Sequence, residues 1–322
     1  MSIIIAGGAG FIGSKLAAHF IKLGQHVLIL DNVCRGREEY IKEYKKEGRL
    51  QFEKLDLADL PATARAVQAF HQKHPVDTVW HMAANSDIPA GIADAHVDLN
   101  DTFMTTFSLL QAMNAAGIKH IAFASSSAIY GDHGPDSILT EDAGPLLPIS
   151  NYGAMKLASE AALSAAAESW LERVWIFRFP NVVGLPATHG VILDFIRKLQ
   201  QTPNRLEVLG NGAQQKAYLH VDELVDAMLF IVAHAQEKVG VYNIGPEDAG
   251  CTVAQIAEAV VGQLSPGSPI AYGNEPRGWV GDVPKFRYSV EKLARLGWRP
   301  KHSSFDAVCR AIGEIRLQEN AP

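Results

Sequence analysis

The stretch Met1-Ser-Ile-Ile-Ile-Ala-Gly-Gly-Ala-Gly-Phe-Ile-Gly13 decides the fold of this chain. Its apolar run Ile3–Ile5 predicts a buried parallel strand, which leads into three glycines spaced Gly7-x-x-Gly10-x-x-Gly13. In such a turn the first glycine permits a sharp bend, and the second lets backbone N–H groups approach a pyrophosphate. The third lets the following helix pack closely on the strand.

The next strand supplies the second part of a dinucleotide-binding pattern. Val27-Leu-Ile-Leu-Asp31 predicts a strand with a carboxylate at its carboxyl end, where the ribose of a dinucleotide is expected. Phe11 and Ile12 would supply the first backbone N–H groups of the helix between the two strands. An ordinary glycine-rich turn is the alternative, but the strand–turn–helix order together with Asp31 favours a dinucleotide.

The composition excludes several classes of protein. The chain has 322 residues, of which 48% are hydrophobic, enough for one large or two modest domains. A formal net charge of −6 argues against a general nucleic-acid or acidic-membrane surface. Three widely spaced cysteines (Cys34, Cys251 and Cys309) are typical of a reducing compartment, and no Cys/His cluster suggests a metal. With no apolar run of about 20 residues, we expect a cytoplasmic protein.

Strand and helix patterns alternate through the first half of the chain and then loosen. Strands are predicted at 3–6, 27–31, 50–54, 77–82, 119–125 and 173–178, and helices at 11–23, 61–73, 98–116 and 151–169. This alternation predicts an α/β fold with a Rossmann-type, doubly wound parallel sheet. We expect a nucleotide-binding domain over 1–178, to which residues 218–245 return as a helix and a strand. A smaller, discontinuous α/β substrate domain is expected over 179–217 and 246–322.

Tyr152 and Lys156 lie one turn apart on the predicted helix at 151–169 and therefore share a face. A tyrosine acts as a base near neutral pH only if its pKa falls from about 10 to about 7, which takes roughly 4 kcal/mol of phenolate stabilisation. A lysine ammonium and a nicotinamide cation supply charge of the required sign. Because Tyr-x-x-x-Lys also occurs by chance on solvated helices, its place in a dinucleotide fold carries the argument.

Three serines leave the carboxyl end of a central strand in Ile121-Ala-Phe-Ala-Ser-Ser-Ser-Ala-Ile-Tyr-Gly131. One of them can hydrogen-bond a substrate alcohol or ketone beside Tyr152, whereas the others can cap loop backbone.

Together these segments resemble the extended short-chain dehydrogenase/reductases, and among them the NAD-dependent nucleotide-sugar epimerases and dehydratases. The resemblance covers essentially the whole chain and implies an isomerase that inverts C4 of a nucleotide sugar, with UDP-glucose and UDP-galactose as the expected pair. The motifs that carry it, in family order and spacing, are Gly7–Gly13, Leu30-Asp-Asn32, Asp56-Leu57, His81-Met-Ala-Ala84, Ser125–Gly131 and Tyr152–Lys156.

The resemblance implies roles for the cofactor residues. Asp31 and Asn32 would hold the adenosine ribose, and a carboxylate there favours NAD over NADP. Arg35 and Arg37 keep NADP open, because an arginine can accept a 2′-phosphate. The other implied contacts are Asp56 and Leu57 at the adenine, and Ala83 and Ala84 under the cofactor. A helix N-cap is the alternative role for Asp56.

The resemblance also implies a mechanism. Ser126 falls at the catalytic serine position, with Ser127 as a neighbour that stays open. Tyr152 would take the proton of the C4 hydroxyl while NAD takes the hydride, and Lys156 would hold the nicotinamide ribose and lower the pKa of Tyr152. A transient 4-keto sugar would turn and accept the hydride on its other face. Related dehydratases carry an acidic pair where this chain has Ser127 and Ala128, which favours epimerisation.

The second half of the chain resembles the family in its substrate contacts. Asn181 and Arg277 would contact the nucleotide diphosphate, with loop ordering and a surface salt bridge as their alternatives. Lys216 stands where an arginine is usual, so a point charge replaces a bidentate group. Asp98 stands where an asparagine is common and stays unassigned, and His81 is interpreted as a structural histidine.

Other interpretations stay open. The substrate alternatives are a CDP- or dTDP-hexose, a UDP-N-acetylhexosamine or a UDP-uronate. Phe286 at the position of the pocket gate disfavours N-acetyl sugars, and the lack of an arginine in 184–190 disfavours uronates. A dehydratase, a reductase or a dinucleotide sensor without turnover is less favoured. A homodimer is expected by resemblance, through the apolar faces of the helices at 97–116 and 151–167.

Overall fold

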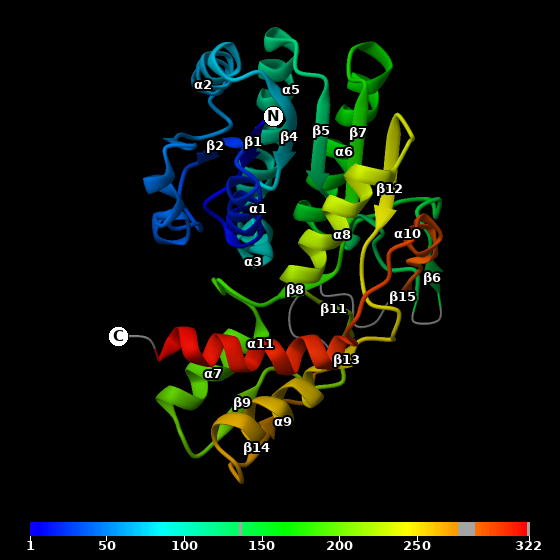
Figure 1. Cartoon of the computed structure of the whole chain (residues 1–322). Coiled ribbons are helices and arrows are strands. Elements are labelled where there is room, and N and C mark those ends of the chain that lie inside the picture. Colours follow the sequence, from blue (N-terminus) through cyan, green and yellow to red (C-terminus); the bar gives the residue numbers. More distant parts are fainter. Residues whose placement is uncertain (135–136, 276–286, 321–322) are drawn as a thin grey trace. The chain divides into compact units, whose positions relative to one another are not determined.

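The computed structural model describes residues 1–134, 137–275 and 287–320, and it divides the chain into two compact units (Figure 1). Unit 1 comprises Met1–Gly131, Pro145–Arg178 and Leu229–Tyr242. Unit 2 comprises Asp132–Gly144, Phe179–Met228 and Asn243–Pro322.

Unit 1 is built on a seven-stranded sheet with the order β12-β7-β5-β4-β1-β2-β3. The pairings that join β3 to β7 are all parallel, which confirms the predicted doubly wound sheet. The strands are β1 (Ser2–Ala6), β2 (His26–Asp31), β3 (Leu50–Lys54), β4 (Val76–His81), β5 (His120–Ala124), β7 (Arg173–Arg178) and β12 (Val239–Asn243). The strand order reverses between β1 and β4, which is where a doubly wound sheet binds its ligand.

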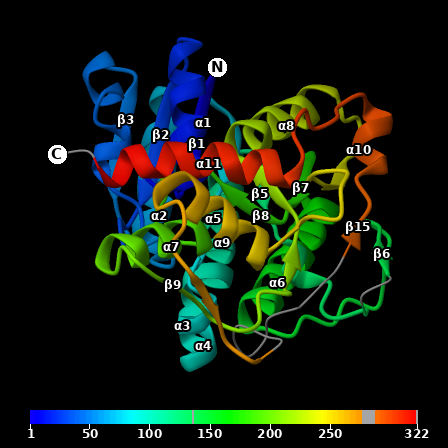
Figure 2. The same cartoon turned by 90° about the horizontal axis from the view of Figure 1, so that it is seen from below.

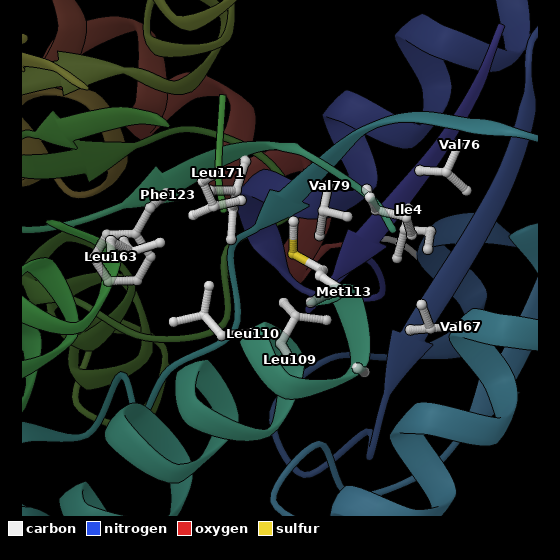
Figure 3. Close-up of a cluster of buried hydrophobic side chains, with 14 of the residues drawn as sticks. Ile4, Val67, Val76, Val79, Leu109, Leu110, Met113, Phe123, Leu163 and Leu171 are labelled. Carbon is white, nitrogen blue, oxygen red and sulfur yellow. The ribbon is translucent and has the colours of Figure 1, made fainter. Parts of the chain in front are cut away.

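Helices cover both faces of this sheet (Figure 2). Helix α1 (Phe11–Lys22) lies on one face, and α2 (Leu60–Lys73), α5 (Thr105–Ala116) and α6 (Asn151–Ser169) lie on the other. Figure 3 shows Leu109, Leu110 and Met113 of α5 pointing toward Ile4 and Val79 of the sheet. Burial of such side chains contributes roughly 25 cal/mol per Å² of apolar surface, so this layer is a main source of stability in unit 1.

The predicted helix at 98–116 is not one regular helix. The structure begins with α4 (Ala95–Asp98), continues as a π-helix over Leu99–Met104 and then becomes α5. A short helix that the sequence patterns did not indicate, α3 (Ile88–Ala93), precedes it and is capped by the Asp87 side chain. A π-helix hydrogen-bonds residues five apart and an α-helix residues four apart. The spacing of apolar residues in the sequence is too similar in the two cases to distinguish them.

Unit 2 pairs its strands two by two around its own apolar core. Its helices are α7 (Val191–Gln201), α9 (Val253–Leu264), α10 (Glu291–Leu296) and α11 (Ser304–Glu319), while α8 (Val221–His234) contributes to both units. The pairs are β8 (Asn181–Val183) with β11 (Tyr218–His220), β9 (Leu206–Val208) with β14 (Ile270–Tyr272), β10 (Gln215–Lys216) with β13 (Cys251–Thr252), and β6 (Ile138–Leu139) with β15 (Arg287–Tyr288). Phe195, Ile256 and Ile312 bring α7, α9 and α11 together in the core.

The two units differ from the expected domains in three segments, of which 243–245 is a shift of one boundary by three residues. Residues 132–144 cluster with unit 2 because β6 pairs with β15, and residues 218–228 cluster with it because β11 pairs with β8. Both pairings join residues that are far apart in the chain, so local sequence patterns do not indicate them.

The turn between β1 and α1 admits no side chain at two of its glycines. Gly7 has a φ of +81°, and a Cβ there would lie 2.6 Å from the backbone nitrogen of Ala83. A Cβ on Gly13 would lie 2.2 Å from the carbonyl oxygen of Gly7. The turn, the start of α1 and the end of β4 therefore approach one another through backbone alone.

We expect Gly13→Ala to destabilise the protein, because backbone atoms surround the new methyl group and cannot rotate away. Overpacking of this kind costs about 1–3 kcal/mol. Gly10→Ala is the matched control, since its Cβ would meet only the Gly7 carbonyl oxygen at 3.2 Å. Thermal denaturation of the cofactor-free protein should show a lower Tm for Gly13→Ala and a nearly unchanged Tm for Gly10→Ala. Equal loss in both variants would contradict the packing argument.

Candidate active site

Asp31 at the end of β2 holds the glycine-rich turn in place. Its buried carboxylate accepts hydrogen bonds from the backbone N–H groups of Ala9 at 2.9 Å and Val33 at 2.8 Å. Burial raises the pKa of Asp31, while these two hydrogen bonds lower it. Val33 has a φ of 54°, which strains a β-branched residue, so the second hydrogen bond helps to hold this unfavourable backbone.

Arg35 is one of the two arginines that could accept the 2′-phosphate of NADP, but its side chain is paired within the protein. Its guanidinium forms an ion pair with Asp87, the residue that caps α3 by accepting a hydrogen bond from the Ala90 N–H. Arg37 contributes a backbone contact, since its N–H donates to the Ala9 carbonyl at 3.0 Å. The structure therefore directs Arg35 toward the segment after β4.

The predicted adenine and under-cofactor residues lie at or near the ends of their strands. Asp56 accepts a hydrogen bond from the Ala58 N–H at 2.9 Å. It is not the N-cap of α2, because Asp59 holds that position with a bond from Ala62 at 3.0 Å. Leu57 is buried in the core. Ala83 lies against Gly7, so a small backbone-lined surface follows β4, and Ala84 is the next residue along it.

Tyr152, Lys156 and Ser126 come together in unit 1. Helix α6 begins after Ser150, whose hydroxyl accepts from the Gly153 N–H at 3.1 Å, and Tyr152 lies in its first turn. The Tyr152 side chain shares a hydrogen bond with Ser126, which follows β5. Lys156 is buried, donates to the Ala124 carbonyl at 2.5 Å and lies 5.9 Å from the Tyr152 ring centre.

Burial sets the charge states of Tyr152 and Lys156. It raises the pKa of Tyr152 to about 12, with the hydrogen bond from Ser126 lowering it and the charge of Asp98 raising it. Burial also lowers the pKa of Lys156 to about 7, although the charge of Glu160 raises it. Lowering the pKa of a tyrosine from about 12 to about 7 takes roughly 7 kcal/mol of phenolate stabilisation. The chain alone therefore keeps Tyr152 protonated, and a further positive charge is required to make it a base.

The chain's relation to known proteins agrees with this arrangement. Residues 3–245 match the model of the NAD dependent epimerase/dehydratase family. The chain belongs to this family. NAD is accordingly its cofactor, as predicted.

Similar proteins extend over the full length of this family member. A UDP-glucose 4-epimerase of Lactobacillus helveticus is 29% identical over 335 residues, which cover 96% of this chain and 94% of the relative. A crystal structure of a UDP-galactose 4-epimerase is 33% identical, has a TM-score of 0.83 and covers 100% of both chains. A UDP-glucose 4-epimerase of Thermus thermophilus in complex with NAD is 26% identical, with a TM-score of 0.84 and 100% coverage of both.

The described residues fit the NAD of this family. The glycine-rich turn is a cradle that a Cβ would fill at Gly7 and Gly13, and no side chain caps the N-terminus of α1. The first N–H groups of α1, at Phe11, Ile12 and Gly13, are therefore the groups that we expect to hold the pyrophosphate. Asp31 and the exposed Asn32 lie at the end of β2, where we expect them to hold the adenosine ribose.

His81 and Asp98 both have structural partners. His81 is fully buried, and its Nε2 lies 2.9 Å from the Thr106 hydroxyl. Burial and the charge of Lys156 lower its pKa to about 3, so it is neutral, in line with a structural histidine. Asp98 is buried and accepts a hydrogen bond from the Asn85 side chain at 2.8 Å. Burial raises the pKa of Asp98, and this hydrogen bond lowers it.

A buried network beside the trio was missed in the sequence. Arg178 donates to both carboxylate oxygens of Glu160, from Nε at 3.1 Å and from Nη2 at 2.7 Å, and its Nη1 donates to the Tyr130 hydroxyl at 3.1 Å. The Ser125 hydroxyl donates to the same carboxylate. The available signal was the position of Glu160, one turn after Lys156 on the same face of the helix.

Of the predicted substrate residues, Ser126, Ser127 and Tyr152 belong to unit 1, whereas Asn181 and Lys216 belong to unit 2. Asn181 is exposed in β8, where it is the register partner of Tyr218 in β11. Lys216 precedes Tyr218 by two residues and is half-buried in β10. Arg277 and Phe286 lie outside the described residues. The structure thus brings Asn181 near the strand segment that carries Lys216.

Two kinds of feature are absent from the described ranges (1–134, 137–275 and 287–320). These ranges contain no group of three or more His, Cys, Asp or Glu side chains that could hold a metal ion. Nor do they contain a helix long and apolar enough to cross a membrane.

We expect Asp31→Ala to weaken NAD binding more than NADP binding. The substitution removes a ribose acceptor, which matters for NAD, and it removes a charge that repels the 2′-phosphate of NADP. It also frees the Ala9 and Val33 amides, so both affinities should fall, but the NAD/NADP preference should drop about tenfold or more. Calorimetric titration of cofactor-free protein with each dinucleotide measures this ratio. An unchanged ratio would contradict the role of Asp31 in cofactor choice.

Proposed function

We propose that this chain is a nucleotide-sugar 4-epimerase that interconverts UDP-glucose and UDP-galactose through a transient 4-keto sugar. The observation that carries the proposal is the meeting of Tyr152, Ser126 and Lys156 at the end of β5, in a chain of the NAD-dependent family. The full-length similarity to UDP-glucose 4-epimerases supports the choice of sugar.

The proposed roles follow from the positions of the three side chains. Tyr152 takes the proton of the C4 hydroxyl, and Ser126 hydrogen-bonds the same oxygen and orients it. Lys156, when protonated, stabilises the phenolate of Tyr152 and holds the nicotinamide ribose. NAD supplies a hydride acceptor and a positive charge when bound, and because it is regenerated we expect it to stay with the protein.

The residues after the catalytic serine support epimerisation over dehydration. Ser127 and Ala128 lie in the short 3₁₀ helix Ser127–Ile129. They occupy the positions at which dehydratases of the family carry an acidic pair. A hydroxyl and a methyl group cannot perform the acid–base step of an elimination. Epimerisation needs no such group.

The remaining assignments of the sugar nucleotide and the assembly are also proposals. We assign the diphosphate to Asn181, Lys216 and Arg277. A homodimer is supported by the exposed side chains of Leu99 and Phe107, which lie on the helical stretch expected to pair with its symmetry mate. The three free cysteines support a cytoplasmic location.

The first test is turnover without added cofactor. Purified protein incubated with UDP-glucose should produce UDP-galactose, read by proton NMR of the anomeric signals. Tyr152→Phe is the control and should lose at least about 100-fold in kcat while retaining NAD, since only the hydroxyl that exchanges the proton is removed. Activity retained by Tyr152→Phe would overturn its role as base. No turnover of UDP-glucose by wild-type protein with bound NAD would redirect the proposal to another nucleotide sugar.

The two adjacent serines provide a matched pair. Ser126 hydrogen-bonds Tyr152 and also accepts from the Ala128 N–H at 3.1 Å, whereas Ser127 lies at the start of the 3₁₀ helix. We expect Ser126→Ala to lower kcat by about 100-fold or more, and Ser127→Ala to change it by only a few-fold. Initial rates at saturating UDP-glucose measure both. The reverse order of effects would assign the catalytic hydroxyl to Ser127.

A further inference from the structure

We propose that Glu160, held by Arg178, is a positioning residue for the reaction: it holds the serine segment after β5 in place through Ser125 and keeps a counter-charge beside Lys156. This inference rests on the proposed function, because it concerns the same trio of Tyr152, Ser126 and Lys156.

The network links three elements that meet around the site. Glu160 comes from α6, Arg178 from the end of β7, and Ser125 from the residue that follows β5. All three residues are at most 6% exposed. Glu160 accepts two hydrogen bonds from Arg178 and one from Ser125, so both of its carboxylate oxygens are engaged.

Ser125 transmits this anchoring to the catalytic hydroxyl. It is the chain neighbour of Ser126, and its hydroxyl is directed to Glu160 while that of Ser126 is directed to Tyr152. Lys156, one turn earlier on the same helix, donates to the carbonyl of Ala124. The segment 124–126 is therefore held at Ala124 and at Ser125 by two side chains of α6, which also carries Tyr152.

A contribution to stability does not by itself explain why Glu160 and Arg178 are buried as an ion pair. Removing two charges from water costs several kcal/mol per ion, and an apolar pair of similar volume is often as stable. Burial lowers the pKa of Arg178, but Glu160 more than offsets this and keeps the pKa above its usual value, so the guanidinium stays charged. A rigid, charged anchor beside a reacting group instead serves to hold catalytic atoms in place.

Charge is the second part of the inference. Lys156 is faced by the ring of Phe123 at 4.7 Å, the ring of Tyr152 at 5.9 Å, the neutral His81 and the carboxylate of Glu160. Asp98 acts on Tyr152 from α4, and Arg178 acts from β7 through its pair with Glu160. Glu160 raises the pKa of Lys156 against the effect of burial. Removing its charge would also take away the negative charge that Glu160 sets against the Arg178 cation, which lowers the pKa of Lys156 further.

Two substitutions separate positioning from charge. Ser125→Ala removes the hydrogen bond and leaves the Glu160–Arg178 pair intact. Glu160→Gln keeps the shape and an acceptor oxygen but removes the charge. Ser169→Ala is the matched control, because Ser169 ends the same helix and its hydroxyl donates locally to the Ala166 carbonyl.

The experiment uses NAD-loaded protein and has two readouts. The first is kcat and KM measured as a function of pH. The second is the NMR resonance of Tyr152 in protein with 13Cζ-labelled tyrosine, identified as the signal that Tyr152→Phe removes. Ser125→Ala should lower kcat about tenfold or more with KM within about twofold, and should shift the Tyr152 resonance, because Ser126 is no longer held. Glu160→Gln should move the high-pH loss of activity to lower pH, since protonated Lys156 is lost as pH rises through its pKa.

If Ser125→Ala and Glu160→Gln both match Ser169→Ala in the two readouts, the inference is overturned and the Glu160–Arg178 pair is a structural element only. If Glu160→Gln does not fold, Ser125→Ala still decides the positioning role. Wild-type protein without epimerase activity would refute the proposed function, and the Tyr152 resonance would then decide the inference independently.

Discussion

The close backbone contact at the end of β1 is the constraint on which the rest of the site depends. Gly7 and Gly13 have no room for a Cβ, and Ala83 lies against Gly7, so β1, α1 and β4 converge without side chains between them. Asp31 then ties the turn to β2 through the Ala9 amide. The start of α1 lies where the strand order of the sheet reverses, which is the position where a doubly wound sheet binds its ligand.

The same burial that builds the site makes its chemistry depend on the cofactor. In the chain alone, desolvation favours a protonated Tyr152 and works against the charge of Lys156. Both effects oppose a phenolate, so the positive charge that the cofactor adds is needed to make Tyr152 a base. In the proposed mechanism Tyr152 therefore becomes a base only with NAD in place, and its hydroxyl already shares a hydrogen bond with Ser126.

Much of the first unit could be predicted because its signals are local. Six of the seven strands of the sheet, β1 to β5 and β7, begin and end within one residue of their predicted positions, since apolar β-branched runs bounded by glycines and polar residues identify buried strands. The π-helix at Leu99–Met104 and the α3 helix were missed, because neither has a distinctive period. The stretch Glu38–Glu47, which lies outside the strands and helices predicted above, forms two short 3₁₀ helices with Ile41 buried.

The sequence by itself determined the dinucleotide fold, the Tyr152–Lys156 face and the candidate serines, because a glycine turn, a helical spacing and a strand end are properties of neighbouring residues. The tertiary structure decided which serine hydroxyl meets Tyr152, which partner Arg35 takes and where the Asp98 carboxylate is satisfied. It also revealed the Glu160–Arg178 pair, whose members are separated by 18 residues in the chain. These outcomes depend on burial and on contacts between distant segments, which set the pKa values and hydrogen-bond partners, and a linear pattern does not contain them.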